Sequence, residues 1–174
     1  KDDEAEFADG WRLRSLVKKY SDHIAFPVVM MSEPAPAEEG EEQEAPKEEA
    51  VNEATALWSL SKSEVKDEEY QSFYKHISHL PDEPFMTIHN KAEGMLEYIN
   101  LLFVPSMKPF DLFHPDRKGS VKLYVKKVYI SEDLELVPAW LRFMRGLVDS
   151  GVPVINSPHG SFKEMARLAI NQAA

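Results

Sequence analysis

The stretch LEYINLLFVPSMKPFDLFHPDRKGSVKLYVKKVYI, residues 96–130, sets the architecture of this chain. Its two ends, residues 96–104 and 121–130, are rich in β-branched, aromatic and aliphatic residues, which is typical of buried strands. The connection between them holds Pro105, Pro109 and Pro115, and proline prevents regular strand pairing. Because this connection is also apolar, we expect it either to fold back onto the sheet or to bind a partner.

The second of these strands changes its pattern part-way along. Apolar and polar residues alternate from residue 121, but the apolar positions shift by one after Lys126. A β-bulge produces such a shift, and we therefore predict a bulge near Lys126. Further strands are predicted at residues 23–31, where Pro27 favours an edge position or a bulge, and at residues 85–89.

Helices are predicted where apolar residues recur every three or four positions. Residues 11–20 follow a plausible cap at Asp9. A second helix has three acidic side chains in its first turn, from Asp67, as the helix dipole favours, and ends before Pro81. A third helix is predicted to begin at Pro138 from a stripe of apolar side chains: Trp140, Leu141, Met144, Leu147 and Val148. Strands and helices thus alternate, and the predicted class is α/β (α+β), with one sheet covered by helices.

An acidic segment interrupts this order at residues 33–50. It contains eight Glu and one Lys and carries −7 of the total net charge of −10, and it has no aromatic residue. Such a composition cannot bury enough apolar surface to offset the entropy of ordering, so we expect a disordered loop at the tip of a hairpin. The rest of the chain carries only about −3, which says little about its partners.

The composition limits the classes of protein to consider. The chain has 174 residues, of which 43% are hydrophobic and 29% are charged, as in globular domains. It has no Cys, which excludes disulfides, thiolate metal sites and thiol nucleophiles and favours a reducing, cytoplasmic location. No apolar run reaches membrane-spanning length, and the start KDDEAEF has neither an initiator Met nor a signal peptide, so we expect a piece of a longer protein.

No pattern in the sequence indicates catalysis. His76 and His79 have helical spacing but lack a third ligand, so no metal site is predicted. Ser157 near His159 is not a nucleophile elbow, and no glycine-rich phosphate loop occurs. We therefore name no catalytic residue and no cofactor for this chain.

Aromatic and aliphatic residues in polar surroundings are the remaining candidates for function. Large apolar side chains dominate the energetics of protein interfaces, and the candidates for such a surface are Trp58, Phe110, Leu112 and Phe113. The alternative is that these side chains pack on the sheet. Their exposure to solvent distinguishes the two interpretations.

Several segments together resemble the first part of the middle domain of bacterial Hsp90 chaperones. They occur in the family's order between residues 11 and 150: WRLRSLVKKYSDHIAFPV, ALWSLSKSEV, EEYQSFYKHIS, LLFVPSMKPFDLF, KLYVKKVYI and PAWLRFMRGLVDS. The resemblance implies a large subdomain at residues 11–150 with the topology of ribosomal protein S5 domain 2. Residues 1–10 would then end the preceding domain or linker, and residues 151–174 form a divergent tail with a possible short helix.

The resemblance also implies a function. It suggests an ATP-dependent, homodimeric chaperone that binds unfolded proteins, in which this segment binds non-native clients and docks to the chain's own N-terminal ATPase domain. In the full-length family ATP binds with Mg²⁺, and neither nucleic acid nor membrane is a partner. The family's client contacts fall on Trp58, Phe110, Leu112 and Phe113, which are the candidates already chosen.

The tail departs from the family pattern. The family's Ser-Arg-Glu motif, whose Arg reaches the ATP γ-phosphate, is absent, since no Arg follows Ser157 and Arg167 is out of register. We therefore expect this segment alone not to be an enzyme. Two alternatives remain, namely an ATPase or other enzyme module with a site at the tail, and a scaffold whose acidic loop recruits basic partners.

Overall fold

The structure is a computed structural model that describes residues 7, 9–32, 46–93, 97–110, 112, 114, 118–134 and 136–151. Phe113, most of the acidic loop, and the tail from residue 152 with its predicted short helix lie outside the described residues. The chain forms two compact units, Lys1–Ala56 and Leu57–Ala174. The predicted domain at residues 11–150 therefore spans both units.

The first unit consists of a helix and a short hairpin. Helix α1, Gly10–Tyr20, begins as predicted at Asp9, whose side chain accepts a hydrogen bond from Trp11 N at 3.2 Å. Strand β1, Val29–Met31, pairs antiparallel with β2, Glu48–Ala50. The hairpin is confirmed, but two details of the prediction are wrong. Residues 21–26 turn instead of continuing a strand, and residues 48–50 of the acidic segment are a strand because β1 pairs with their main chain.

Polar contacts hold the first unit together. None of the residues of α1 is buried, and among the described residues of this unit Ala56 is the only buried apolar side chain. The side chain of Asn52 instead links three positions of the main chain in this unit. Its amide donates to Ser21 O and Phe26 O and accepts from Val28 N. Hydrogen bonds therefore replace an apolar core in this part of the chain.

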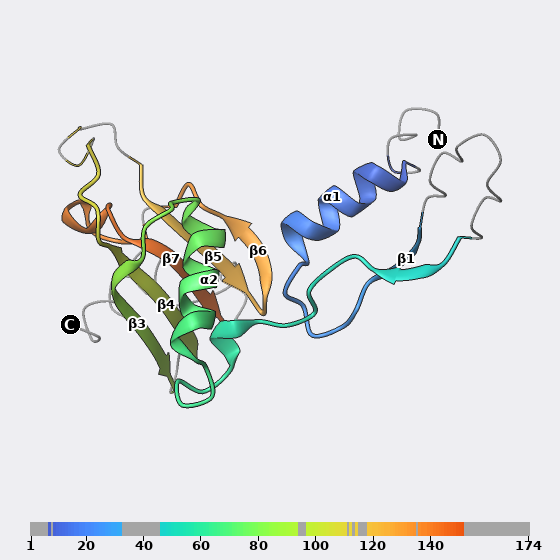
Figure 1. Ribbon diagram of the computed structural model, residues 1–174, viewed down its shortest axis with the longest axis horizontal. Coiled ribbons are helices and arrows are strands. Elements are labelled where there is room, and N and C mark those ends of the chain that lie inside the picture. Colours follow the sequence, from blue (N-terminus) through green and yellow to red (C-terminus); the bar gives the residue numbers. More distant parts are fainter. Residues whose placement is uncertain are drawn as a thin grey trace, which may run out of the picture. The chain divides into compact units, whose positions relative to one another are not determined.

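The second unit is a five-stranded mixed sheet with a helix on one face, as Figure 1 shows. The strand order is β3-β4-β7-β5-β6, in which only β5 and β7 are parallel. The elements are η2 (Leu57–Ser59), α2 (Asp67–Ser78), β3 (Pro84–Ala92), β4 (Tyr98–Pro105), β5 (Ser120–Val125), β6 (Val128–Ser131), η3 (Ala139–Leu141) and β7 (Arg145–Ser150). The predicted α+β class, the helix at residues 67–78 and the central strands are confirmed.

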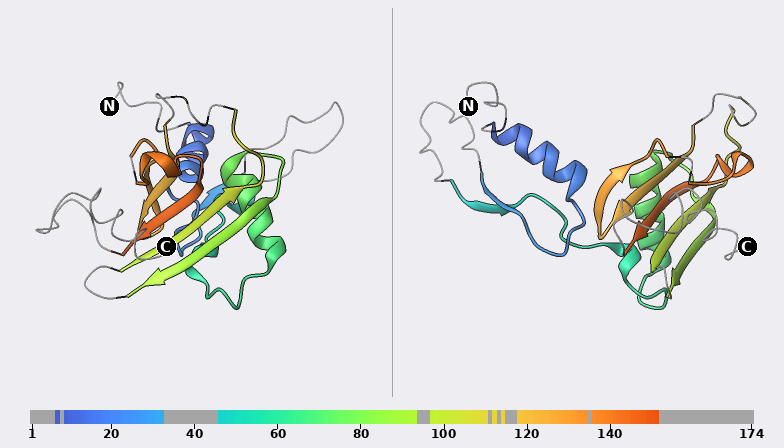
Figure 2. Two further views of the ribbon diagram at one scale, coloured as in Figure 1. Left: turned by 90° about the vertical axis from the view of Figure 1, so that its left-hand side faces the viewer. Right: turned by 180° about the vertical axis from the view of Figure 1, so that it is seen from behind.

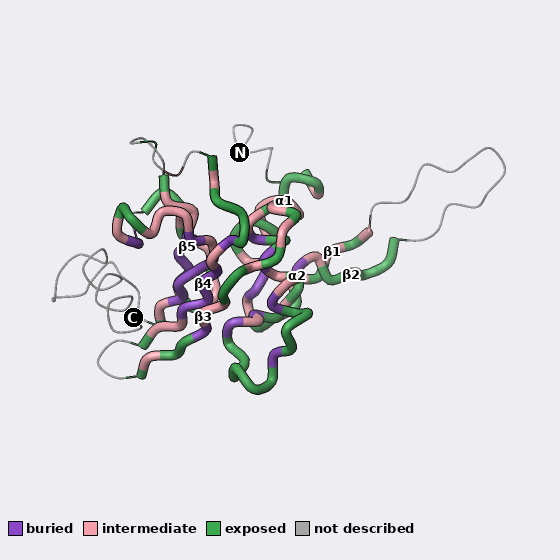
Figure 3. Tube along the Cα trace, turned by 60° about the vertical axis from the view of Figure 1, so that its left-hand side comes forward, coloured by how far each residue is buried: buried purple, intermediate pink, exposed green. Residues whose placement is uncertain are grey.

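Both faces of this sheet are covered by described residues. On one face α2 and η2 pack aromatic rings against the strands, with Tyr74 and Phe103 5.4 Å apart between ring centroids. On the other face the segment that contains η3 closes a second apolar cluster of buried side chains: Leu102, Val121, Leu123, Leu136, Val137, Met144 and Val148. Burial is therefore concentrated in the inner strands, as the tube in Figure 3 shows.

The helix predicted from Pro138 is wrong. Only a single turn, η3, forms there, and residues 145–150 are the central strand β7 between β4 and β5. A strand that is buried on both faces has a continuous apolar run, which periodicity alone cannot distinguish from a helix. Within this strand the backbone requires glycine at position 146, because its φ is +129° and a Cβ there would lie 2.1 Å from Leu101 O.

The bulge predicted near Lys126 is also wrong. Lys126 and Lys127 have φ values of 49° and 68°, so they form a tight two-residue turn between β5 and β6. Positive φ at both central residues is the mark of a type I′ hairpin turn. The shift in the apolar pattern thus comes from a change of strand, and the register irregularity lies instead between Leu123 and Tyr124.

No helix among the described residues is long and apolar enough to cross a membrane.

Candidate functional site

Exposed apolar side chains gather at one end of the five-stranded sheet. Phe85 and Met86 stand at the start of β3, and Met107 and Phe110 follow the end of β4. The pairing of Pro84 with Pro105 and of Phe103 with Arg145 places the start of β3, the end of β4 and the start of β7 together, as Figure 2 shows. We call this surface the apolar end and define it by its exposed side chains: Phe85, Met86, Met107, Phe110 and Trp140.

A hydrogen-bonded carboxylate anchors the segment after β4. Asp82 Oδ2 accepts from Met107 N at 3.2 Å and from the Ser106 hydroxyl at 3.0 Å, and Asp82 Oδ1 accepts from the Tyr74 hydroxyl at 2.9 Å. Burial favours a higher pKa for the Asp82 carboxyl, but these three hydrogen bonds outweigh it and lower the pKa. Asp82 therefore ties the segment that carries Met107 and Phe110 to the end of α2.

The same contact affects the tyrosine. Burial, followed by the hydrogen bond to Asp82, raises the pKa of the Tyr74 hydroxyl to about 12. The hydroxyl therefore remains a hydrogen-bond donor throughout the ordinary pH range. Leu112 N then donates to Pro109 O at 3.2 Å, and Phe110, which follows Pro109, is exposed to solvent.

The four predicted contact residues differ in their exposure. Phe110 is fully exposed, at 103% of its reference area, and Leu112 is half-buried. Phe113 lies outside the described residues. The structure adds Phe85, Met86 and Trp140, whose exposure no local sequence pattern indicates.

The expectation that Trp58 is exposed is wrong. Its side chain is 0% exposed, and its ring packs against Tyr124 and Phe73 at centroid distances of 5.1 and 5.8 Å. Its indole Nε1 donates to Asp149 Oδ2 at 2.8 Å. The residues next to Trp58 in the sequence gave no sign of this, because its partners come from α2, β5 and β7. In this structure Trp58 is a core residue and is not part of the apolar end.

Trp58 also belongs to a chain of buried hydrogen bonds. His89 Nε2 lies 3.0 Å from Trp58 O, and a carbonyl oxygen can only accept, so Nε2 donates. His89 Nδ1 then accepts from the Tyr70 hydroxyl at 2.6 Å. The chain fixes η2 between α2 and β3, and Asp149 continues it by accepting from Lys127 N in the β5–β6 turn at 3.2 Å.

One buried polar side chain has no such partner. Asn100, at the centre of β4, is 0% exposed, and neither its Oδ1 nor its Nδ2 has a hydrogen-bond partner in the part of the chain that the structure describes. A buried amide without partners lowers the stability of a fold. Asn100 faces the apolar cluster beside Val148, with which it pairs across the strands.

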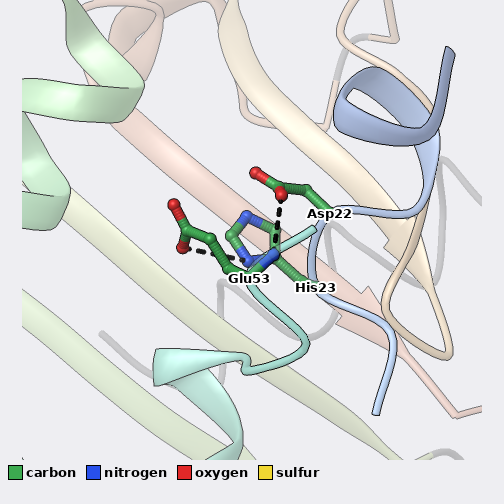
Figure 4. Close-up of side chains that lie close together, drawn as sticks. All are labelled: Asp22, His23 and Glu53. Carbon is green, nitrogen blue, oxygen red and sulfur yellow. Dashed lines mark hydrogen bonds and ion pairs between the residues drawn. The ribbon is translucent and has the colours of Figure 1, made fainter. Parts of the chain in front are cut away.

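In the first unit, Asp22, His23 and Glu53 lie close together, as Figure 4 shows. Their ligand atoms lie within 4.8 Å of one another, which is a spacing that could hold a metal ion. Their contacts do not suit one. His23 Nδ1 donates to Thr55 O at 2.9 Å, and Asp22 Oδ1 accepts from Glu53 N at 3.0 Å.

A lysine already supplies the positive charge in this cluster. Lys18 Nζ lies 3.1 Å from Asp22 Oδ2 and 3.5 Å from Glu53 Oε1. Burial favours a lower pKa for Lys18, but its hydrogen bonds and the charges of Asp22 and Glu53 outweigh it and raise the pKa. We conclude that the cluster fastens the end of α1 to residues 53–55 as a structural ion pair.

Comparison with known proteins identifies the family. The model of the family described as Hsp90 protein matches residues 35–156. The chain belongs to the Hsp90 family. Among its relatives is the chaperone protein HtpG of Paramagnetospirillum magneticum, which is 54% identical over 149 residues, or 84% of this chain and 22% of that protein.

Two other chaperone proteins of this Hsp90 family are similar to the chain over nearly the same length. The chaperone protein HtpG of Shewanella oneidensis is 52% identical over 156 residues, 86% of this chain and 24% of its own length. The HtpG of Rickettsia bellii is 50% identical over 151 residues, 86% of this chain and 23% of its own length. The chain therefore spans about a quarter of the length of the curated relatives it matches, and the resemblance to bacterial Hsp90 is confirmed.

Proposed function

We propose that this Hsp90 segment binds non-native client proteins through the apolar end of its sheet. The observation that carries the proposal is the exposure of Phe110, with Met107, Phe85, Met86 and Trp140 around the same end. Monomeric soluble domains rarely expose several large apolar side chains together, and such surfaces mark binding sites. A chaperone needs a surface of this kind, because non-native proteins are recognised by the apolar side chains they have failed to bury.

Two features of the apolar end suit that task, namely its methionine side chains and the anchored main chain at Met107. Methionine is flexible and adapts to partners of different shape, and two of the five side chains of the apolar end are Met86 and Met107. Asp82 meanwhile anchors the backbone at Met107, so binding does not have to order this part of the chain. Burying one side chain such as Phe110 contributes about 1.5–3 kcal/mol.

We extend the proposal to the full-length protein. There the segment would act as the first part of a middle domain that docks to a nucleotide-binding domain, in a homodimer that uses ATP with Mg²⁺. The names of the relatives support the chaperone role. The chain covers 22% and 24% of two of these relatives, which supports its role as one part of a larger protein. The absence of Cys supports a cytoplasmic location.

The test is a binding assay with a reduced, carboxymethylated protein that cannot fold. The double variant Met107→Ser, Phe110→Ser should bind this unfolded protein about 100-fold or more weakly than the unaltered chain, because it loses about 3–6 kcal/mol of transfer energy from two large side chains. Its melting temperature should be unchanged, because both residues are exposed. Phe26→Ser, which removes an exposed aromatic ring in the first unit, is the matched control and should bind normally.

Equal binding by the double variant and by the control would contradict the proposal. The enzyme alternative has its own test, since ATP added to this chain should leave its melting temperature unchanged; a rise of several degrees would favour a nucleotide site. The scaffold alternative is tested by deleting residues 33–45, which spares the β2 strand. Loss of binding to a basic partner after that deletion would favour the scaffold.

A further inference from the structure

The first strand of the five-stranded sheet has a free edge. β3 contributes nine residues and pairs with β4 on one side over residues 84–92. On its other side no described strand pairs with it, since β3 is the first strand in the order β3-β4-β7-β5-β6. Within the second unit, Figure 1 likewise shows no other described strand alongside this outer edge.

The main chain of this edge offers hydrogen-bonding groups. In an antiparallel strand alternate residues direct both N–H and C=O away from the neighbour, so an edge strand presents a row of such groups. Among the described residues, the main chain of residues 86–90 pairs only with β4 and makes no other main-chain hydrogen bond. The contacts of His89 with Tyr70 and Trp58 are made by its side chain, which turns inward, and they leave its outer main-chain edge open.

Protection of this edge is limited to its ends. Proteins guard edge strands with proline, bulges and charges, which prevent pairing with other chains. β3 has Pro84 and a register shift before Met86 at its start, and Lys91, paired with Glu93 at 2.7 Å, near its end. The residues between them, MTIHN at 86–90, contain neither proline nor an outward charge. The centre of the edge is therefore open to pairing.

We propose that an extended, uncharged segment of a non-native protein adds to this sheet as a sixth strand along β3. This inference rests on the proposed function and specifies how the client is held. An edge of main-chain donors and acceptors is matched by another extended main chain, as in other cases of strand addition. Because residues 86–90 offer no opposite charge, a Lys or Glu in the added segment would lose hydration without gaining a partner.

The neighbouring surface selects the side chains of the added strand. Met86 is half-exposed at the edge and Phe85 precedes it, and both belong to the apolar end. An added strand that begins beside Met86 is thus continuous with the apolar end, where its apolar side chains are buried against Met107 and Phe110. The opposite edge, β6, is less suitable because it has only four residues and forms three pairs with β5.

The experiment uses two labelled probe peptides with identical side chains. One is an eight-residue peptide of Val, Thr and Ile, and the other is its depsipeptide, in which esters replace the central amides. The esters remove N–H donors without adding bulk, so strand addition predicts that the depsipeptide binds the unaltered chain about tenfold or more weakly. Amide hydrogen exchange at residues 86–90 should slow when the all-amide peptide is bound.

A charge placed on the edge gives a second test. Asn90→Lys introduces an exposed positive charge at the last residue of the open segment 86–90 and should weaken binding of the all-amide peptide about tenfold. Ser72→Lys makes the same change in charge at an exposed position of α2 and is the matched control, which should bind normally. The melting temperature of both variants shows whether folding is preserved.

Three results would overturn the inference. If both peptides bind equally and only Met107→Ser, Phe110→Ser weakens them, strand addition is wrong although the proposed function stands. If the chain forms dimers that Asn90→Lys dissociates, the edge pairs with a second copy. If neither peptide binds and the unfolded protein does not bind either, strand addition and the proposed function both fail.

Discussion

Replacing Trp58 by Ala tests the assignment of this residue to the core. Removal of a fully buried Trp side chain costs about 3–5 kcal/mol of the free energy of unfolding, and the ring here contacts Phe73 and Tyr124. The change also leaves Asp149 Oδ2 without its indole donor, which adds about 1–3 kcal/mol. We therefore expect Trp58→Ala to lower the free energy of unfolding by about 4 kcal/mol or more.

The two contributions can be separated in the same experiment. Trp58→Phe retains most of the apolar area but lacks the Nε1 donor, so its cost should be about 1–3 kcal/mol, mostly that of the unpaired Asp149 oxygen. Trp140→Ala is the matched control, because Trp140 is 70% exposed in the same unit, and it should change the free energy of unfolding by about 0.5 kcal/mol or less.

The assay is equilibrium unfolding in urea followed by far-ultraviolet circular dichroism, with the free energy extrapolated to water for each variant. A cost for Trp58→Ala as small as that for Trp140→Ala would refute the reasoning. It would mean that the ring is exposed, and it would return Trp58 to the surface that contacts clients.

Two further predictions concern single polar side chains. Asn100→Leu should raise the free energy of unfolding by about 1–3 kcal/mol in urea unfolding, because the buried amide has no partner among the described residues; lower stability would show that it does make hydrogen bonds. Asp82, whose pKa is lower in the folded chain than in the unfolded chain, should contribute stability above about pH 4 and lose it as the pH falls through its folded pKa. Asp82→Asn should therefore be less stable than the unaltered chain at pH 7 and approach it at low pH, whereas a difference that is constant with pH would contradict this role.

The anchoring of the apolar end has a consequence for the proposed function. Asp82 holds Met107 through a main-chain hydrogen bond, and Tyr74 holds Asp82 from α2. Loss of Asp82 therefore frees the segment that presents Phe110 without removing any apolar side chain. This separates the effect of positioning on client binding from the effect of apolar area.

Local patterns in the sequence were sufficient for the elements whose neighbours are near in the chain. The helix at residues 67–78 has acidic side chains in its first turn and buries one stripe, Tyr70, Tyr74 and Ile77, which local periodicity shows directly. The strands in the apolar runs at residues 96–104 and 121–125 could likewise be predicted from the composition of a few consecutive residues. The same runs, in the family's order, also indicated the Hsp90 relationship.

Tertiary contacts decided the rest. Residues 145–150 are a strand and not a helix because β4 and β5 pair with both of their sides, and those partners are distant in the chain. Trp58 is buried because Phe73 and Tyr124 pack against its ring, and Asp149, 91 residues away, accepts its indole hydrogen. Periodicity measures how apolar residues are spaced along the chain, whereas exposure depends on which segments pack on them, and only the folded structure determines that packing.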